Sequence, residues 1–335
     1  MFFVLTGLLF QPYQPGGVFP RKGRPACHRS RTLYISVRNL LIFLTSKPIN
    51  NYFFNSQKWI KENVQWHNDG TMSYSTRKEF SFVPELSVGD HSKDQITLAN
   101  VPAISAMYQN RYASYWNKLL IEGVLTGFLG HDMWVTRSPE QFVWGYNEPL
   151  FELAKTYMPA GSAPPSNNFG FFVDKNQSVN LPSYTMHTGE GSPYDLSKIS
   201  SYNGSQYLKI WDGDQCNRVQ GSDGATFNPY IQREEQLWFF NDQLCRSMPL
   251  VFDSAVKSGD LPGYRFKPDE NVFKMDFEKY PENKCFCEGE DLCDMIGDGM
   301  FAVSKCQFNA PIILSWPHFL DANQTYFEKI KGKQF

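Results

Sequence analysis

The chain has 335 residues, enough for one large domain or two smaller ones. Its 32 Lys and Arg residues against 34 Asp and Glu residues give a net charge of −2, which argues against a general nucleic-acid binder. Aromatic residues make up 16% of the chain, so disorder over most of its length is excluded.

The N-terminal part, residues 1–55, shows no sustained hydrophobic period and contains a basic, proline-containing patch at 20–25. We interpret it as an unmatched segment that can be disordered, and the patch as a solvated tail rather than a membrane or nuclear signal. No stretch of 18 apolar residues occurs, so no segment is predicted to span a membrane.

Residues 62–83 predict a β-hairpin. Val64 and Trp66 alternate with polar residues before the sequence Asn68-Asp69-Gly70, and alternation resumes after it. An Asp-Gly pair tolerates the positive φ angles that a tight hairpin turn needs.

Residues 103–158 change to helical spacing, with apolar residues three or four positions apart. A second helix is expected where Ser138 can cap, Pro139 suits the first helical position and Gln141 can complete a capping box. Such aromatic-rich helices are most often core, and the alternative is an apolar face turned to solvent or membrane. The aromatic residues assigned to the first helical region are Tyr108, Tyr115, Trp116, Phe128 and Trp134.

From about residue 166 the chain returns to short strand-like pieces, and no internal repeat is visible. Strands on both sides of a helical insert predict an α+β fold dominated by antiparallel sheet. The strand-like pieces are 169–173, 208–210, 236–240, 263–266 and 310–314.

Six of the seven cysteines lie between residues 216 and 306, close to Asn-x-Ser/Thr sequons at Asn176, Asn203 and Asn323. Clustered cysteines with sequons favour an oxidising, luminal or extracellular compartment. The cysteine spacing fits disulfides better than a zinc site, and the residues alone leave 15 pairings open. Cys27 is expected to be unpaired.

Catalytic patterns are missing from the sequence. It contains no Gly-x-Ser-x-Gly elbow, phosphate loop or His-Glu-x-x-His motif. We therefore expect neither an enzyme nor a cofactor, catalytic residue or metal site, and the alternative is a secreted hydrolase with an unrecognised nucleophile.

An ordered series of motifs from about residue 58 to 330 resembles the class B scavenger receptor family. This is the family of the fatty-acid translocase, the high-density lipoprotein receptor and the lysosomal integral membrane protein, and the details resemble arthropod members. In chain order the motifs are Asn68-Asp69-Gly70-Thr71, Pro102-Ala103-Ile104, Trp144-Gly145-Tyr146, Cys216-Asn217, Gly221-Ser222-Asp223-Gly224-Ala225-Thr226-Phe227, Cys245-Arg246-Ser247, Tyr264-Arg265-Phe266, Cys285-Phe286-Cys287, Ser304-Lys305-Cys306, Ala310-Pro311 and Pro317-His318-Phe319-Leu320.

The resemblance implies a single ectodomain over residues 56–335, with a large antiparallel β-barrel-like core, a helical bundle at the apex (103–158) and an internal lipid tunnel. It implies a receptor at the plasma membrane that binds lipids, fatty acids, sterols or lipoproteins and transfers lipid to the membrane. The apical residues implied to meet the ligand are Tyr115, Trp116, Phe128 and Trp134. The implied disulfides are Cys216–Cys285, Cys245–Cys306 and Cys287–Cys293.

The chain also departs from the family pattern. Relatives carry a membrane-spanning helix at each end and continue for about a hundred residues of sheet beyond the position of Leu320, so we expect a truncated member. The lysine pair that binds ligands in the fatty-acid translocase falls on Phe128 and Gly130, which does not support anionic-ligand binding by that route. The alternative functions are a lysosomal or secretory-pathway protein-transport receptor of the same family, or a non-functional truncated isoform.

Overall fold

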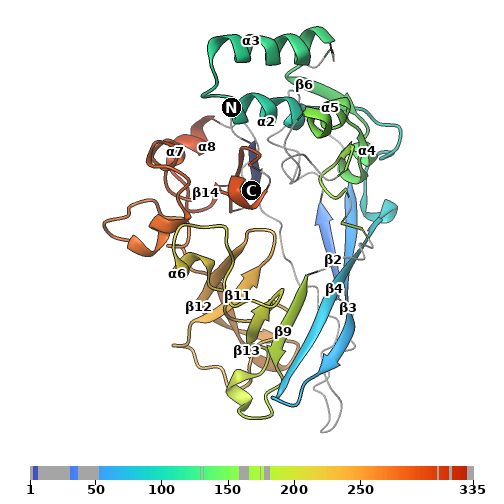
Figure 1. The fold of residues 1–335 in the computed structure, drawn as a ribbon. Coiled ribbons are helices and arrows are strands. Elements are labelled where there is room, and N and C mark those ends of the chain that lie inside the picture. The colour runs from blue at the N-terminus through green and yellow to red at the C-terminus, as the bar shows by residue number, and fades with distance from the viewer. Residues whose placement is uncertain are drawn as a thin grey trace. The chain divides into compact units, whose positions relative to one another are not determined.

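The structure is a computed structural model of the chain (Figure 1). Cys27 and most of the N-terminal segment, for which predictions were made above, lie outside the residues that the structure describes. The described residues are 3–6, 31–36, 53–128, 130, 132–157, 166–173, 175–176, 182–307, 309–316 and 319–329.

The chain divides into two compact units, and each is built from three separate stretches of sequence. Unit 1 consists of Met1–Ile60, Arg77–Val179 and Ala302–His318. Unit 2 consists of Lys61–Thr76, Asn180–Phe301 and Phe319–Phe335.

The predicted hairpin is confirmed as the strands β3 (Phe54–Trp66) and β4 (Thr71–Phe82). Asp69 Oδ1 accepts the backbone N–H of Thr71 at 3.0 Å, and Gly70 takes the positive φ of +75° that its lack of a Cβ permits. The strand order of the sheet is β10-β9-β4-β3-β2, with antiparallel pairing of β2 to β3, β4 to β9 and β9 to β10. Its other strands are β2 (Arg31–Ser36), β9 (Ser183–His187) and β10 (Ile199–Tyr202).

Unit 1 packs helices and short strands around one apolar core. Buried side chains of β5 (Ile96–Ala99), α2 (Val101–Gln109) and α4 (Pro139–Trp144) meet there, with Phe142 only 1% exposed. The remaining elements of this unit are β1 (Phe3–Thr6), η2 (Pro84–Leu86), α3 (Tyr115–Glu122), η3 (Gly123–Phe128), β6 (Trp134–Arg137), β7 (Tyr146–Asn147), α5 (Pro149–Tyr157), β8 (Asn168–Phe169), η6 (Ser304–Cys306) and β15 (Ile312–Ser315). The strand β14 (Met300–Ala302) is divided, with Met300 and Phe301 in unit 2.

The predicted capping box at the start of α4 is confirmed. Gln141 N–H donates to Ser138 Oγ at 3.2 Å, and Ser138 N–H donates to Gln141 Oε1 at 3.1 Å. Pro139 occupies the first turn, where its missing N–H costs nothing. Local side-chain chemistry therefore sets where this helix begins.

Three local assignments were wrong. The strand expected at 208–210 is absent, and these residues form a bend before α6. Trp134 opens strand β6 and pairs with Ala99 of β5, because the Trp-Val-Thr run suits a pleated surface and Thr136 Oγ1 bonds Thr97 Oγ1 across the pair at 2.7 Å. The strand expected at 169–173 ends with β8, and the backbone N–H of Phe171 instead donates to Phe142 O at 2.8 Å.

The sheets are antiparallel apart from β1, which pairs parallel to β15. Within the described residues the strands form separate sheets and no closed barrel. The fold is thus mixed α and β as expected, while the barrel-like core and its tunnel stay predictions.

Unit 2 contains the three-stranded antiparallel sheet β11-β12-β13 and the disulfide-bonded region. Arg246, at the start of β12, is buried, and its guanidinium lies 3.7 Å from the ring centroid of Phe286 and 5.0 Å from that of Phe301. Arg246 also donates to Val272 O at 2.9 Å and to Asn283 Oδ1 at 3.0 Å. We call this group the arginine cage. The elements are β11 (Leu237–Asn241), β12 (Arg246–Ser258), β13 (Leu261–Pro268), η4 (Pro193–Asp195), α6 (Asp214–Asn217), η5 (Pro281–Phe286), α7 (Glu290–Ile296) and α8 (Gln324–Lys329).

Candidate ligand-binding surface

Helix α2 carries the chain out of the unit 1 core. Its N-cap Asn100 accepts from Ala103 N–H at 3.3 Å, and its first four residues are buried. Its second half leaves the core, so that Met107 is exposed. Asn110 ends the helix by donating to Ala106 O at 2.9 Å, which breaks the first helical region into two helices.

Helix α3 follows, capped by Ser114, and none of its residues is buried. Large apolar side chains nevertheless occupy much of it: Tyr115 is 71% exposed, Trp116 70% and Leu120 68%. In Figure 1 α3 lies beside α2, and contacts join the two helices. We call the exposed apolar side chains of this segment the α3 face, which comprises Met107, Tyr112, Tyr115, Trp116, Leu119 and Leu120.

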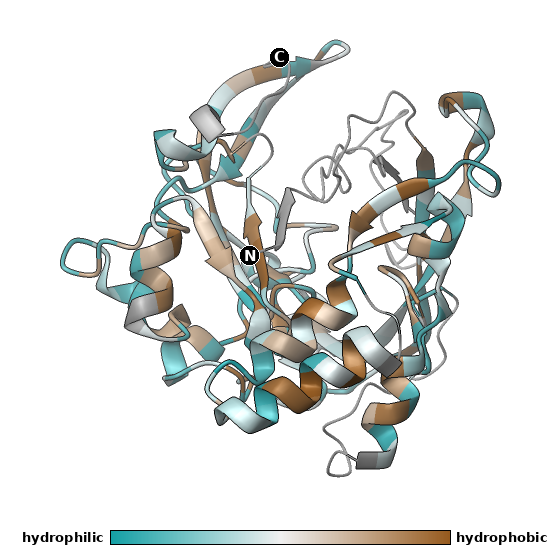
Figure 2. Cartoon of the chain, turned by 90° about the horizontal axis from the view of Figure 1, so that it is seen from above, coloured by the Kyte–Doolittle hydropathy of each residue, from teal (hydrophilic) through white to brown (hydrophobic). Residues whose placement is uncertain are grey.

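Contacts at both ends fix the segment that carries the α3 face. Leu125, in the π-helical turn η3, is 2% exposed and anchors the end of the segment. At the other end the Arg111 guanidinium lies 3.8 Å from the Tyr108 ring centroid and 4.6 Å from that of Tyr112. Figure 2 shows hydrophobic and hydrophilic residues interleaved along these helices. Clustered exposed apolar side chains on a soluble surface mark an interaction site.

The structure brings two of the four predicted apical residues together. Tyr115 and Trp116 are neighbours on α3, with ring centroids 5.6 Å apart in an edge-to-face arrangement. Trp134 is exposed at the start of β6, a separate element, and the side chain of Phe128 lies outside the described residues. Leu119 and Leu120 also belong to the α3 face. They were not among the predicted ligand-contacting residues, although their spacing of four residues from Tyr115 and Trp116 indicates the same face of the helix.

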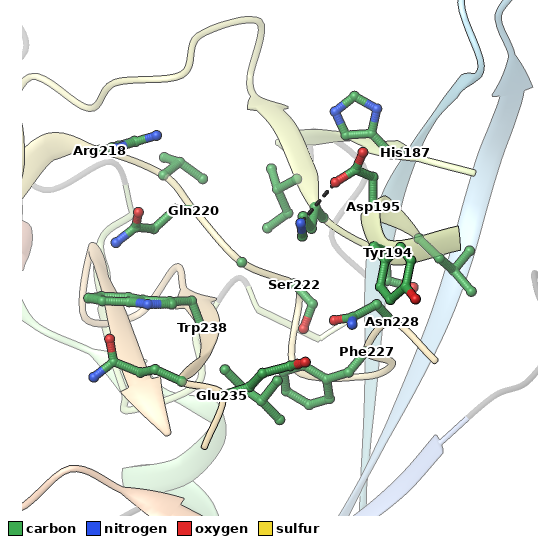
Figure 3. A pocket seen from close by; sticks show the side chains of 18 of the residues that line it. His187, Tyr194, Asp195, Arg218, Gln220, Ser222, Phe227, Asn228, Glu235 and Trp238 are labelled. Carbon is green, nitrogen blue, oxygen red and sulfur yellow. Dashed lines mark hydrogen bonds and ion pairs between the residues drawn. The ribbon is translucent and has the colours of Figure 1, made fainter. Parts of the chain in front are cut away.

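A second candidate lies in unit 2, where a pocket of about 620 Å³ opens between β9, β11 and the loop 218–228 (Figure 3). Gly221 makes its wall possible: φ is +81°, and a Cβ there would lie 2.0 Å from Trp238 O. That close approach lets Ser222 N–H donate to Trp238 O at 2.9 Å. Sequence reasoning missed this pocket because its residues come from distant segments.

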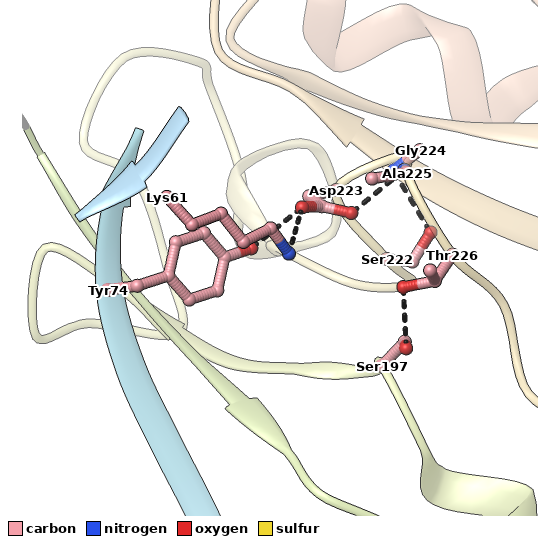
Figure 4. Close-up of polar contacts among 8 residues, drawn as sticks. All are labelled: Lys61, Tyr74, Ser197, Ser222, Asp223, Gly224, Ala225 and Thr226. Atoms are coloured by element: carbon pink, nitrogen blue, oxygen red, sulfur yellow. Dashed lines mark hydrogen bonds and ion pairs between the residues drawn. The ribbon is translucent and has the colours of Figure 1, made fainter. Parts of the chain in front are cut away.

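A buried ion pair holds the same loop (Figure 4). Lys61 Nζ lies 2.9 Å from Asp223 Oδ2, and the Tyr74 hydroxyl donates to that oxygen at 2.8 Å. Burial alone raises the pKa of Asp223, but the Lys61 ammonium and the hydrogen bonds from Lys61, Tyr74 and the Ala225 N–H outweigh it. The net pKa lies below the ordinary value, so Asp223 is ionised at neutral pH.

The six cysteines between residues 216 and 306 are all disulfide-bonded. Cys216 is bonded to Cys285 and Cys287 to Cys293, each pair with its Cα atoms 6.0 Å apart, in agreement with the pairing that the resemblance implied. Cys245 and Cys306 are also disulfide-bonded, and the pairing expected for them stays a prediction.

All three sequon asparagines are exposed. The Asn176 side chain is engaged with strand β4: its Oδ1 accepts from Phe80 N–H at 3.0 Å and its Nδ2 donates to Phe80 O at 3.5 Å. Asn203 lies in a turn with a positive φ of 51°. Asn323 Oδ1 accepts from Thr325 N–H and Oγ1, each at 3.0 Å, which leaves its Nδ2 outside those bonds.

The described part of the chain has neither a metal-binding cluster nor a membrane-spanning helix. No group of three or more His, Cys, Asp or Glu side chains there could hold a metal ion. No helix there has the length and apolar character needed to cross a membrane.

Comparison with known proteins assigns the chain to a family of membrane receptors. A family model described as the CD36 family matches residues 51–334, and the chain belongs to that family. The chain is 32% identical to lysosome membrane protein 2 of Mus musculus over 273 residues, covering 81% of this chain and 54% of the relative. It is 31% identical to scavenger receptor class B member 1 of Bos taurus over 274 residues, covering 81% and 51%. The chain thus spans about half the length of these curated relatives.

Proposed function

We propose that this chain forms part of a receptor ectodomain that binds lipids or lipoproteins through the α3 face. The observation that carries the proposal is a helix without a buried residue that exposes Tyr115, Trp116 and Leu120. Membership of the CD36 family, with a relative named as a scavenger receptor, supports the same role.

The chemistry of the α3 face suits a lipid surface. Burying apolar area gains roughly 25 cal/mol per Å², and part of that gain offsets the cost of association. Tyr and Trp have an apolar body and a polar group, which is why they accumulate at the boundary between lipid and water. Arg111 and Lys118 lie in the same segment and can meet lipid phosphates.

Transfer of the bound lipid through a tunnel to the plasma membrane belongs to the proposal and is supported by the sequence resemblance. Disulfide-bonded cysteines and exposed sequon asparagines support exposure of the chain to an oxidising compartment outside the cytosol. The proposal assigns no catalytic residues.

A second candidate function is protein transport to the lysosome. The observation in its favour is the 32% identity to lysosome membrane protein 2. An exposed helix face could bind a cargo protein by the same burial of Trp116 and Leu120.

The experiment measures binding of the purified, disulfide-bonded chain to reconstituted phosphatidylcholine–cholesterol particles of lipoprotein size. Trp116→Ala and Leu120→Glu should each weaken binding by about tenfold. Trp66→Ala is the matched control, because Trp66 is also exposed but belongs to β3 and is not part of the α3 face. Unchanged binding by both α3 variants would contradict a role for the α3 face.

A further inference from the structure

The pocket of unit 2 presents polar groups and aromatic faces rather than an aliphatic wall. Of its four aliphatic members, Ile199, Val219 and Leu237 are buried in the core, and only Leu196 is half-buried. In Figure 3, Arg218, Gln220 and Trp238 line one side, while His187, Asp195 and Tyr194 line the other. Apart from Leu196, the free surface of the pocket is therefore made of amides, charged groups, hydroxyls and rings.

The charges of the pocket balance. Asp195 pairs with Lys198, with Oδ1 2.8 Å from Nζ, and Arg218 and Glu235 bring one charge of each sign. A net charge would favour an anion or a cation, and a continuous aliphatic lining would favour an acyl chain. Neither condition is met, so the pocket suits a neutral ligand with many hydrogen-bonding groups.

Polyhydroxylated ligands match this combination. Gln220 and Asn228 carry amides that both donate and accept, and Glu235 accepts, so each can meet ring hydroxyls. Trp238 is half-buried and offers an aromatic face on which the apolar face of a sugar ring can pack.

The wall that carries these groups is fixed before any ligand arrives. Ile199 N–H donates to Gly221 O at 2.7 Å, and Ser222 N–H donates to Trp238 O at 2.9 Å. Farther along the loop, Asp223 is held by its buried ion pair, and Ser197 Oγ bonds Thr226 Oγ1 at 2.8 Å (Figure 4). A preordered wall lowers the entropy lost on binding.

We infer that this pocket is a binding site for a neutral saccharide, with Trp238 as the stacking platform and Gln220, Asn228 and Glu235 as hydrogen-bonding partners. The site uses none of the residues of the α3 face, so it is independent of the proposed lipid-binding function.

The experiment uses saturation-transfer NMR and calorimetry on the full, disulfide-bonded chain with maltose, lactose, mannobiose and diacetylchitobiose. At least one disaccharide should bind, and Trp238→Ala should weaken that binding by about tenfold. Gln220→Ala is a second variant that keeps the fold, because the anchoring bond to Ser247 Oγ at 3.0 Å comes from the backbone N–H of Gln220. Trp66→Ala is the matched control, since Trp66 belongs to unit 2 but lies outside the pocket.

Each outcome supports or overturns the inference. Loss of disaccharide binding in the Trp238 and Gln220 variants, with Trp66→Ala and Trp116→Ala unchanged, supports it. The absence of binding by all four disaccharides overturns it. It is also overturned if sodium oleate binds instead and Trp238→Ala reduces oleate binding, because the pocket would then accept an acyl chain. Failure of particle binding by the α3 face would leave these results unaffected.

Discussion

The α3 face and the arginine cage are both rich in aromatic residues, and they use them in opposite ways. In the cage the rings of Phe286 and Phe301 close around the buried Arg246. On α3 the rings of Tyr115 and Trp116 face solvent. Residue type alone therefore does not decide burial; the difference is whether cross-links and polar partners hold other segments over the rings.

The cage has such partners and α3 does not. The disulfide Cys216–Cys285 ties α6 to η5, and Trp211 Nε1 donates to Cys245 O at 2.7 Å beside it. The described part of α3 contains no buried residue and no disulfide. The first region is built for stability, and the second leaves its apolar area available to a ligand. Three of the following five predictions test this contrast.

The largest effect is expected from removing the disulfide Cys216–Cys285 by changing both cysteines to Ser. Its sequence separation is 69 residues, and closing a loop of that size is worth about 4 kcal/mol in the chain-entropy model. Urea unfolding of the double variant should show this loss. The control is Cys287→Ser with Cys293→Ser, which opens a loop with a separation of only 6 and should cost less.

The arginine cage should be the next most sensitive site. Arg246→Ala leaves Val272 O and Asn283 Oδ1 without the hydrogen bonds that Arg246 donates and removes the cation from three rings, at a cost of about 3 kcal/mol. Arg265→Ala is the control, because Arg265 is exposed in its ion pair with Asp253 and should cost less than about 1 kcal/mol. Equal unfolding free energies for the two variants would refute the contrast.

Loss of the ion pair between Lys61 and Asp223 should have the third-largest effect on the free energy of unfolding. Asp223→Asn leaves Lys61 without its counter-charge and should cost about 2 kcal/mol, whereas Asp195→Asn at the exposed pair with Lys198 should cost almost nothing. Because the folded pKa of Asp223 is lowered, its contribution is complete above the ordinary Asp pKa of about 4 and is lost as the pH falls through the folded pKa. The stabilities of wild type and Asp223→Asn should therefore converge below about pH 4.

On α3 the change in stability should be smallest. Leu120→Glu places a carboxylate on a side chain that is already exposed, so the free energy of unfolding should change by about 0.5 kcal/mol or less. The same change at buried Leu125, one helical turn on, should abolish secretion because a carboxylate would have to be buried. If Leu120→Glu is as damaging as Leu125→Glu, α3 packs against another surface.

Glycan occupancy is expected to differ among the sequons. The glycan is attached to Nδ2, and Nδ2 of Asn176 donates to Phe80 O, so that site should be modified less than Asn203 and Asn323. Glycopeptide mass spectrometry of protein secreted from eukaryotic cells measures the three occupancies. Full modification of Asn176 with little at the other two would contradict this order.

The parts of the fold that depend on local sequence signals were predictable. The Asn68-Asp69-Gly70 turn and the Ser138 cap depend on a few adjacent residues, and both lie where expected. Trp134 was misassigned because its strand exists only by pairing with Ala99, which no local pattern reveals.

The candidate sites show the same difference between features set by adjacent residues and features set by distant ones. The exposure of Tyr115 and Trp116 was one of two alternatives, since helical spacing shows that a stripe is apolar but not whether anything covers it. The pocket was not predicted, because Gln220 and Trp238 meet only through the close approach of Gly221 to the Trp238 carbonyl.

The interleaving of the two units has a consequence for dissecting the molecule. Strands β3 and β4 each contribute residues to both units, so the chain passes from one unit to the other within a continuous strand. Neither unit can be cloned as one uninterrupted stretch, and a single proteolytic cut anywhere between residues 61 and 318 leaves each fragment with parts of both. Isolating either unit would require a circularly permuted or spliced gene, and functional mapping of this protein is better done with point variants than with deletions.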